Sequence, residues 1–149
     1  MIPTTFRAFQ ASDVQPCLAL FDENCPRFFA ANERDDYEHF LKTPGDYRVG
    51  LRETTIVAAF GMSADLGQKR HRLTWILVSP AAQGTGVGRQ MMDQVLKHSR
   101  RQGAVAVDIA ASQHSAPFFA KFGARTTRTI PNGWGAGMHR VDMVLALTE

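Results

Sequence analysis

The sequence predicts a mixed α/β (α+β) fold in which helices cover both faces of a central sheet. Three observations support this prediction. Segments with the two-residue period of a strand and segments with the 3.6-residue period of a helix follow one another along the chain. The segment Arg72–Val78 is apolar on both faces, as expected for a strand that is covered from both sides. A glycine-rich turn joins that strand to a strongly amphipathic helix.

The N-terminal half is expected to supply a strand, two helices and two more strands. Ser12 offers a hydroxyl as a helix cap, and the apolar residues that follow it recur at helical spacing. The turn residues Thr43–Asp46 would end the second helix. The expected elements are a strand at Thr4–Phe9, a helix of about three turns after Ser12, a helix at Asn32–Lys42, and strands at Tyr47–Arg52 and Ile56–Ala64.

The C-terminal half is expected to alternate strands and helices around the glycine-rich turn. A helix from about Gly86 to Gln102 places its apolar residues inward and its charged residues outward. Gly103 follows at the position where helices commonly end in a left-handed residue. The remaining expected elements are a strand at Val105–Ala110, a short helix at Ser115–Phe122 and a last strand at Val141–Leu147.

The composition is typical of a soluble globular protein and argues against several classes of function. With 149 residues, 44% of them hydrophobic, the chain lacks the run of ~18–20 apolar residues that crosses a bilayer. Its first residues do not form a secretory signal, so we expect a cytoplasmic protein without a membrane partner. The formal charge of +3 suits an anionic ligand but is too small to indicate nucleic acid. Cys17 and Cys25 fit no metal-ligand spacing, so no metal is expected.

The segment Trp75–Arg89, WILVSPAAQGTGVGR, predicts an anion-binding site. It reads as a strand, a glycine-rich turn and a helix. The glycines let backbone approach a ligand closely, and the helix start presents free N–H groups and the positive end of its dipole. This arrangement suits a phosphate or a pyrophosphate. The dinucleotide fingerprint fails at Arg89, and a P-loop would need a lysine after Gly88.

Two motifs resemble those of the GNAT acetyltransferases. The run Val78–Gly88 has the outline V-x-P-x-x-Q-x-x-G-x-G, which resembles the family signature [RQ]xxGx[GA] after a strand that ends in V-x-P. One helix and one strand further on, Pro117–Ala124, PFFAKFGA, resembles the family motif FYEKxGF. The resemblance covers about Arg72–Gly123 and implies that residues 1–149 form a single GNAT domain.

The resemblance implies a fold, a cosubstrate and a reaction. The GNAT fold has a mostly antiparallel mixed sheet of about six to seven strands, splayed between the fourth and fifth strands, with about four helices. Acetyl-CoA would place its pantetheine arm in that gap, and a primary amine of a small molecule or protein would attack the thioester directly. A backbone N–H at Val78 would stabilise the oxyanion. The residues expected to contact the coenzyme are Leu77, Val78, Gln83, Gly84, Thr85, Gly86, Val87, Gly88 and Arg89.

The sequence departs from the family pattern at both positions of proton transfer. Phe119 replaces the tyrosine that is frequently the general acid, which leaves water, Ser112, His114 or Ser115 to protonate the thiolate. The usual carboxylate of the fourth strand is also missing. The candidate bases that remain are His71, His114, Glu23, Glu33 and Asp35.

Several alternatives stay open at this point. The missing acid and base allow a non-catalytic acyl-CoA-binding or sensing module as well as an enzyme. The segment Ile130–Gly137 either forms a mobile loop that covers the acceptor or a loose hairpin anchored by the indole of Trp134. No motif identifies the acceptor, and no surface identifies the interface of the possible homodimer that the resemblance suggests.

Overall fold

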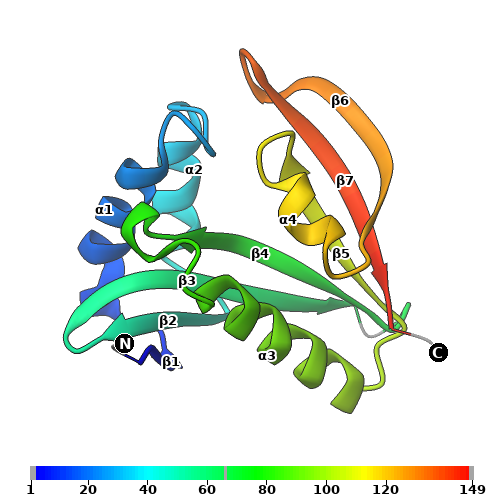
Figure 1. The fold of residues 1–149 in the computed structure, drawn as a ribbon, viewed down its shortest axis with the longest axis horizontal. Helices are drawn as coiled ribbons and strands as arrows, with labels where there is room; N and C mark the ends of the chain where they lie inside the picture. The colour runs from blue at the N-terminus through cyan, green and yellow to red at the C-terminus, as the bar shows by residue number, and fades with distance from the viewer. Residues whose placement is uncertain (1–2, 66, 148–149) are drawn as a thin grey trace.

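The computed structural model describes residues 3–65 and 67–147. In this part of the chain seven strands form one sheet in the order β1-β2-β3-β4-β5-β7-β6 (Figure 1). Neighbouring strands are antiparallel except for β4 and β5, which are parallel. The predicted mixed, mostly antiparallel sheet is therefore confirmed.

The expected helices and strands are all present, with ends that shift by a few residues. Short 3-10 turns precede α1 and α3, at Ala11–Asp13 and Pro80–Ala82. The elements are β1 (Thr5–Ala8), α1 (Val14–Asn24), α2 (Glu33–Phe40), β2 (Asp46–Arg52), β3 (Thr55–Asp65), β4 (Arg70–Val78), α3 (Val87–Arg101), β5 (Ala106–Ser112), α4 (Ala116–Ala120), β6 (Arg125–Gly135) and β7 (Met138–Ala146). No helix of the described ranges is long and apolar enough to span a membrane.

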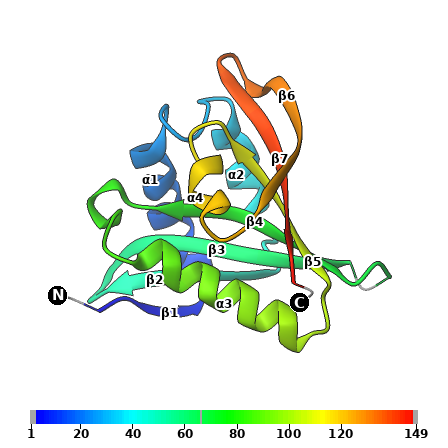
Figure 2. The same cartoon turned by 45° about the vertical axis from the view of Figure 1, so that its right-hand side comes forward.

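Two apolar cores lie on opposite faces of the sheet. Successive residues of a strand point to opposite faces, so Ala58 and Phe60 of β3 join one core while Ala59 joins the other. The core of Phe60 is completed by α3 and α4, and the core of Ala59 by α1 and α2. Figure 2 shows α3 on one side of the sheet and α1 and α2 on the other. Any opening in the middle of the sheet therefore connects two different helix layers.

The sheet splits between β4 and β5. The two strands pair only where Arg70–Arg72 lies beside residues 106–108. Beyond this point β4 stays with β3, while β5 stays with β7, and the two halves diverge (Figure 1). The splay expected between the fourth and fifth strands is confirmed, and it leaves the edge of β4 from Leu73 onward without a strand neighbour on the β5 side.

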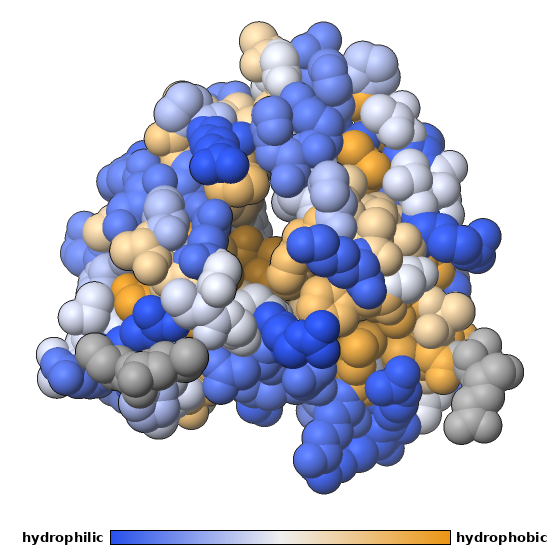
Figure 3. All heavy atoms as spheres, in the orientation of Figure 1, coloured by the Kyte–Doolittle hydropathy of each residue, from blue (hydrophilic) through white to orange (hydrophobic). Residues whose placement is uncertain are grey.

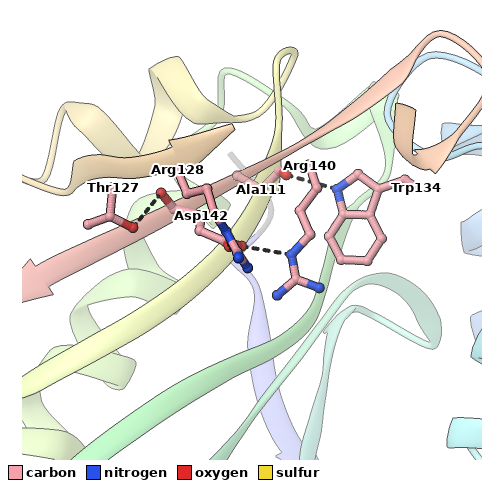
Figure 4. A network of polar contacts seen from close by, with 6 residues as sticks. All are labelled: Ala111, Thr127, Arg128, Trp134, Arg140 and Asp142. Carbon is pink, nitrogen blue, oxygen red and sulfur yellow. Dashed lines mark hydrogen bonds and ion pairs between the residues drawn. The ribbon is translucent and has the colours of Figure 1, made fainter. Parts of the chain in front are cut away.

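The segment Ile130–Gly137 is a hairpin rather than the loop that was one of two expectations. β6 continues to Gly135, which pairs with Met138 of β7. The indole of Trp134 donates its N–H to the carbonyl of Ala111 at 2.9 Å, as Figure 4 shows. The guanidinium of Arg140 lies 5.2 Å from the centre of the indole ring. The glycines of Ile130–Gly137 are compatible with a loop, but pairing with β7 and the anchoring of Trp134 on β5 decide the conformation.

Candidate active site

A cavity of about 760 Å³ lies where β4 and β5 separate. Its lining comes from both helix layers: the start of α3 and the α4 segment on one face, and the α1–α2 region on the other. Figure 3 shows a central hollow between the two halves with hydrophobic side chains around it. The cavity therefore crosses the sheet, and two molecules can reach its centre from opposite faces.

The glycine-rich turn before α3 forms one entrance. Gly84 and Gly86 have φ angles of 78° and 92°, in the left-handed region that favours glycine. A Cβ at either position would meet nothing within 4 Å, so backbone conformation rather than space requires these glycines. Gly88 differs, because a Cβ there would lie 2.8 Å from the ring of Phe118. It allows α3 to pack against α4.

The start of α3 is available to an anion. Gly86 is the N-cap residue of α3, and no side chain of the described residues caps it. The first N–H groups of a helix lack intrahelical acceptors, and the dipole adds a positive partial charge there. Arg89 and Lys121 line the same end of the cavity, and Arg89 lies 5.7 Å from the ring centre of Phe122. These groups together suit a phosphate or pyrophosphate.

Most of the residues predicted to contact a coenzyme line this cavity. Thr85 and Val87 do not: Val87 is buried in the core, and the hydroxyl of Thr85 donates to the carbonyl of Ala82. The guanidinium of Arg52, at the end of β2, donates to the hydroxyl of Thr85. The two residues are 33 positions apart in the sequence, so no local pattern could reveal this contact. The predicted residues that line the cavity are Leu77, Val78, Gln83, Gly84, Gly86, Gly88 and Arg89.

The free edge of β4 presents the backbone of Val78 to the gap. Ser79 donates its N–H to the carbonyl of Val57 on β3 at 2.7 Å. Backbone groups alternate between the two edges of a strand, so those of Val78 point away from β3 and those of Leu77 point toward it. The amide of Gln83 donates to the Val78 carbonyl at 3.3 Å, in agreement with this direction. Of the two predicted backbone contacts, the register therefore favours Val78.

The candidate acids gather on the turn between β5 and α4. Ser112, His114 and Ser115 all line the cavity. The hydroxyl of Ser112 accepts the N–H groups of His114 and Ser115 at 3.1 and 3.3 Å and so fixes the turn. Ser115 is the N-cap residue of α4, but its side chain does not bond the helix N–H groups; its hydroxyl oxygen instead accepts the N–H of Ser112 at 3.0 Å. The Ser115 hydroxyl also lies 3.4 Å from the hydroxyl of Ser112, so its proton can be donated either to Ser112 or into the cavity.

The tyrosines do not replace the missing acid. Phe119 is buried and lines the cavity with a ring that has no proton to donate. Tyr37 and Tyr47 are fully buried, and their hydroxyls lie 2.8 Å apart. Tyr47 donates to the carbonyl of Trp75 at 2.6 Å, where β4 bulges and Trp75 has a φ of 33°. Burial raises the pKa of both tyrosines well above the usual value, and they hold the β4 bulge in place.

Of the candidate carboxylate bases, the structure brings only Glu33 to the cavity. Glu33 begins α2 and is 5% exposed. Burial raises the pKa of its carboxyl group to about 7, although the N–H of Ala30, 2.8 Å from Oε2, opposes the shift. Glu23 and Asp35 are exposed and do not line the cavity. A carboxyl group that changes charge near neutral pH suits proton transfer.

His71 lies apart from this cavity. Its Nδ1 is 2.8 Å from the hydroxyl of Ser99 on α3, and its ring is buried. It lines a separate cavity of about 220 Å³ near the start of β4. Burial lowers the pKa of the His71 imidazole, and the neighbouring His98 lowers it further. The structure therefore separates His71 from the other candidate acids and bases of the cavity. Among the described residues no cluster of three or more His, Cys, Asp or Glu side chains could hold a metal ion.

Comparisons with known proteins agree with this geometry. The family model of the acetyltransferase (GNAT) domain matches residues 20–147. No curated protein sequence matches the chain. Similar solved structures include a protein from Desulfovibrio desulfuricans assigned as a GNAT-family acetyltransferase, with a TM-score of 0.80 and 18% identity over 98% of this chain and 100% of that one. Ard1 from Thermoplasma volcanium has a TM-score of 0.79 and 18% identity over 98% of this chain and 99% of that one.

A third structure, yncA from Salmonella typhimurium, was solved with its cofactor acetyl-CoA; its TM-score is 0.72, with 16% identity over 99% of this chain and 95% of that one. Identities this low support the fold alone. The match of the family model covers most of the chain and agrees with the split sheet and the glycine turn. The chain therefore belongs to the GNAT acetyltransferase domain family.

Proposed function

We propose that the protein transfers an acetyl group from acetyl-CoA to a primary amine by direct attack in a ternary complex. The observation that carries this proposal is the cavity that crosses the split sheet between the uncapped start of α3 and the buried carboxyl group of Glu33. Family membership and the acetyl-CoA bound to the similar Salmonella protein support the choice of donor. The coenzyme enters from the α3 face and the amine from the α1–α2 face.

The turn from Gln83 to Gly88 would hold the pyrophosphate of the coenzyme. Its N–H groups and the positive end of the α3 dipole attract the phosphates. Arg89 and Lys121 add positive charge at the cavity wall, and Arg52 adds charge beside Thr85. The pantetheine arm would then follow the free edge of β4, where the backbone of Val78 is available for hydrogen bonds.

Each step of the reaction has a group on this chain to support it. The amine nitrogen forms a bond to the thioester carbon, and the N–H of Val78 stabilises the negative charge that develops on the oxygen. Glu33 accepts the proton that the nitrogen loses. The C–S bond then breaks, and the departing thiolate takes a proton from Ser115, from His114 or from water on the β5–α4 turn. Holding both reactants in one cavity supplies much of the rate.

A non-catalytic acyl-CoA-binding module is the competing function, because Phe119 replaces the usual acid. Measuring the free thiol released from acetyl-CoA in the presence of a panel of primary amines distinguishes an acetyltransferase from a binding module. We expect thiol release that depends on both substrates and equals the amount of acetylated amine formed. Tight binding of acetyl-CoA without thiol release, whichever amine is added, would assign the chain to the sensing module instead.

Phe119→Tyr tests whether protonation of the thiolate limits turnover. The substitution adds a hydroxyl to the cavity wall on a side chain that is 2% exposed. We expect the fold to survive and kcat to rise severalfold, because a positioned general acid contributes up to about 10²–10⁴ in rate. Steady-state kinetics with saturating acetyl-CoA measure the effect. Phe122→Tyr adds the same hydroxyl to a neighbouring lining residue and serves as the control. A fall in kcat for Phe119→Tyr would mean that the ring has a packing role.

A further inference from the structure

The amine side of the cavity has an aromatic wall. Five aromatic residues line it from the α1–α2 region, β4 and the β6–β7 hairpin. They are Phe28, Phe29, Phe40, Trp75 and Trp134, and we call them the aromatic wall. Three other aromatic lining residues belong to the α4 segment on the coenzyme side. The two ends of the cavity therefore differ, and the amine side is the one that contains Glu33.

The aromatic wall is held in place by contacts behind it. The indole of Trp75 lies nearly parallel to the ring of Phe29, with centres 6.0 Å apart, and 6.1 Å from the ring of Phe40. Tyr37, fully buried, contacts the same indole at 4.8 Å. Trp134 is fixed by its hydrogen bond to Ala111 (Figure 4). A preorganised set of flat rings favours a flat apolar ligand, which stacks on it without reordering the wall.

The charge of the lining limits the charge of the acceptor. Of the lining residues that the structure describes, Glu33 is the only carboxylate. Arg72, Arg89 and Lys121 line the cavity with positive charge. One buried carboxylate can pair with one ammonium group, and a further ammonium group would be desolvated without a carboxylate partner. The lining therefore disfavours a polycationic amine.

The hairpin closes the amine side against a long chain. Asn32, at the start of α2, donates its side-chain amide to the carbonyl of Trp134 at 2.7 Å. Gly135 packs against Asn32 and Ala30 so closely that a Cβ at this position would overlap both. The hairpin and the start of α2 thus meet across the end of the cavity. This contact narrows the amine end of the cavity beside Glu33 and Trp134, which favours a small molecule over an extended polypeptide.

We infer that the acceptor is a small primary amine with a flat aromatic body and a single positive charge. Its ring stacks on the aromatic wall, and its amino group is directed to Glu33. This inference rests on the proposed acetyltransferase function, which it deepens by naming the class of acceptor.

A panel of four amines tests the inference through thiol release from acetyl-CoA. The amines are 2-phenylethylamine, butylamine, spermidine and a short peptide with a free N-terminus. We expect kcat/KM for 2-phenylethylamine to exceed the kcat/KM of each other amine by at least about tenfold, because an amine without a ring loses the apolar contacts with the wall. Equal or better turnover of spermidine or the peptide would overturn the inference but leave the function standing. No thiol release with any amine would overturn the function itself.

A matched pair of variants tests the aromatic wall directly. Phe28→Leu removes a ring from the wall at a half-buried position. Phe9→Leu removes a half-buried ring that packs on the core behind Phe29, Phe40 and Trp75 without lining the cavity. We expect Phe28→Leu to raise KM for 2-phenylethylamine by about five- to tenfold, with a smaller change for butylamine and an unchanged Kd for acetyl-CoA. Equal changes for both amines, or the same selective change in Phe9→Leu, would contradict a role of the wall in recognition.

Discussion

Gly86→Glu is expected to weaken acetyl-CoA binding by about a hundredfold, which corresponds to about 2.7 kcal/mol. The new carboxylate would stand at the N-cap of α3, where the pyrophosphate is proposed to bind. Two like charges a few ångströms apart at a protein surface repel by about 1–4 kcal/mol, which is enough for the expected loss. A Cβ at Gly86 meets no atom within 4 Å, so the side chain can be accommodated. Isothermal titration calorimetry with acetyl-CoA measures the effect.

Gly103→Glu is the matched control for this substitution. Gly103 lies just beyond the other end of α3, has a φ of 78° and would also place its Cβ in open space. Both variants bear the same new charge and the same cost of about 1–2 kcal/mol for a side chain in left-handed backbone. We therefore expect a normal Kd in Gly103→Glu, together with a larger loss of Tm than in Gly86→Glu, because a carboxylate is unfavourable at the negative end of the helix dipole and favourable at the positive end. An unchanged Kd in folded Gly86→Glu would remove the coenzyme site from this turn.

Glu33→Gln is expected to lower kcat/KM by roughly 10²–10⁴, the usual contribution of a general base. Glutamine keeps a carbonyl oxygen that can accept the N–H of Ala30, so the start of α2 should be preserved. The wild-type enzyme should gain activity as pH rises through about 7, because the base must lose its proton first. This limb of the pH profile should vanish in Glu33→Gln, while the limb due to ionisation of the acceptor remains.

Asp35→Asn is the control for this prediction. Asp35 lies in the same first turn of α2, is exposed and does not line the cavity. We expect its kcat/KM to stay within about twofold of wild type, as for most surface substitutions. A loss of activity in Asp35→Asn equal to that in Glu33→Gln, or a full rate in Glu33→Gln, would mean that Glu33 is not the base.

Stability measurements show whether Glu33→Gln is folded. The pKa of Glu33 rises from 4.5 to about 7 in the folded protein, so between these values the folded state binds more protons than the unfolded state. The free energy of unfolding contributed by this group is therefore full below pH 4.5 and falls as pH rises toward 7. Glutamine does not ionise, so the variant should gain in Tm relative to wild type as pH rises across this window.

The fold and the conformation of the glycine-rich turn could be predicted because their signals are local. The glycine-rich turn, the strand before it and the amphipathic helix after it are consecutive in the chain, and their backbone geometry follows from residue type. Gly86 and Gly103 both have the positive φ that their positions suggested. The order of strands and helices likewise indicated a mixed sheet, which the strand pairing confirms.

Other features could not be predicted because they depend on distant segments. The sequence offered five candidate bases without a reason to prefer Glu33, since the pKa of a carboxyl group rises toward neutral pH only in particular surroundings, which for Glu33 means burial. The contact of Arg52 with Thr85 joins residues 33 positions apart. The turn residues near Trp134 allowed either a loop or a hairpin anchored by the indole, and only pairing with β7 and the bond to Ala111 decide for the hairpin.

The sequence by itself determined the family fold and the conformation of the turn at which we propose that an anion binds, because hydrogen-bonding geometry at a helix start is set by neighbouring residues. Only the tertiary structure decided which carboxylate enters the cavity, which rings form the aromatic wall, and how the hairpin closes it. Those properties arise from desolvation and packing, which depend on the atoms that surround a side chain rather than on its position in the chain.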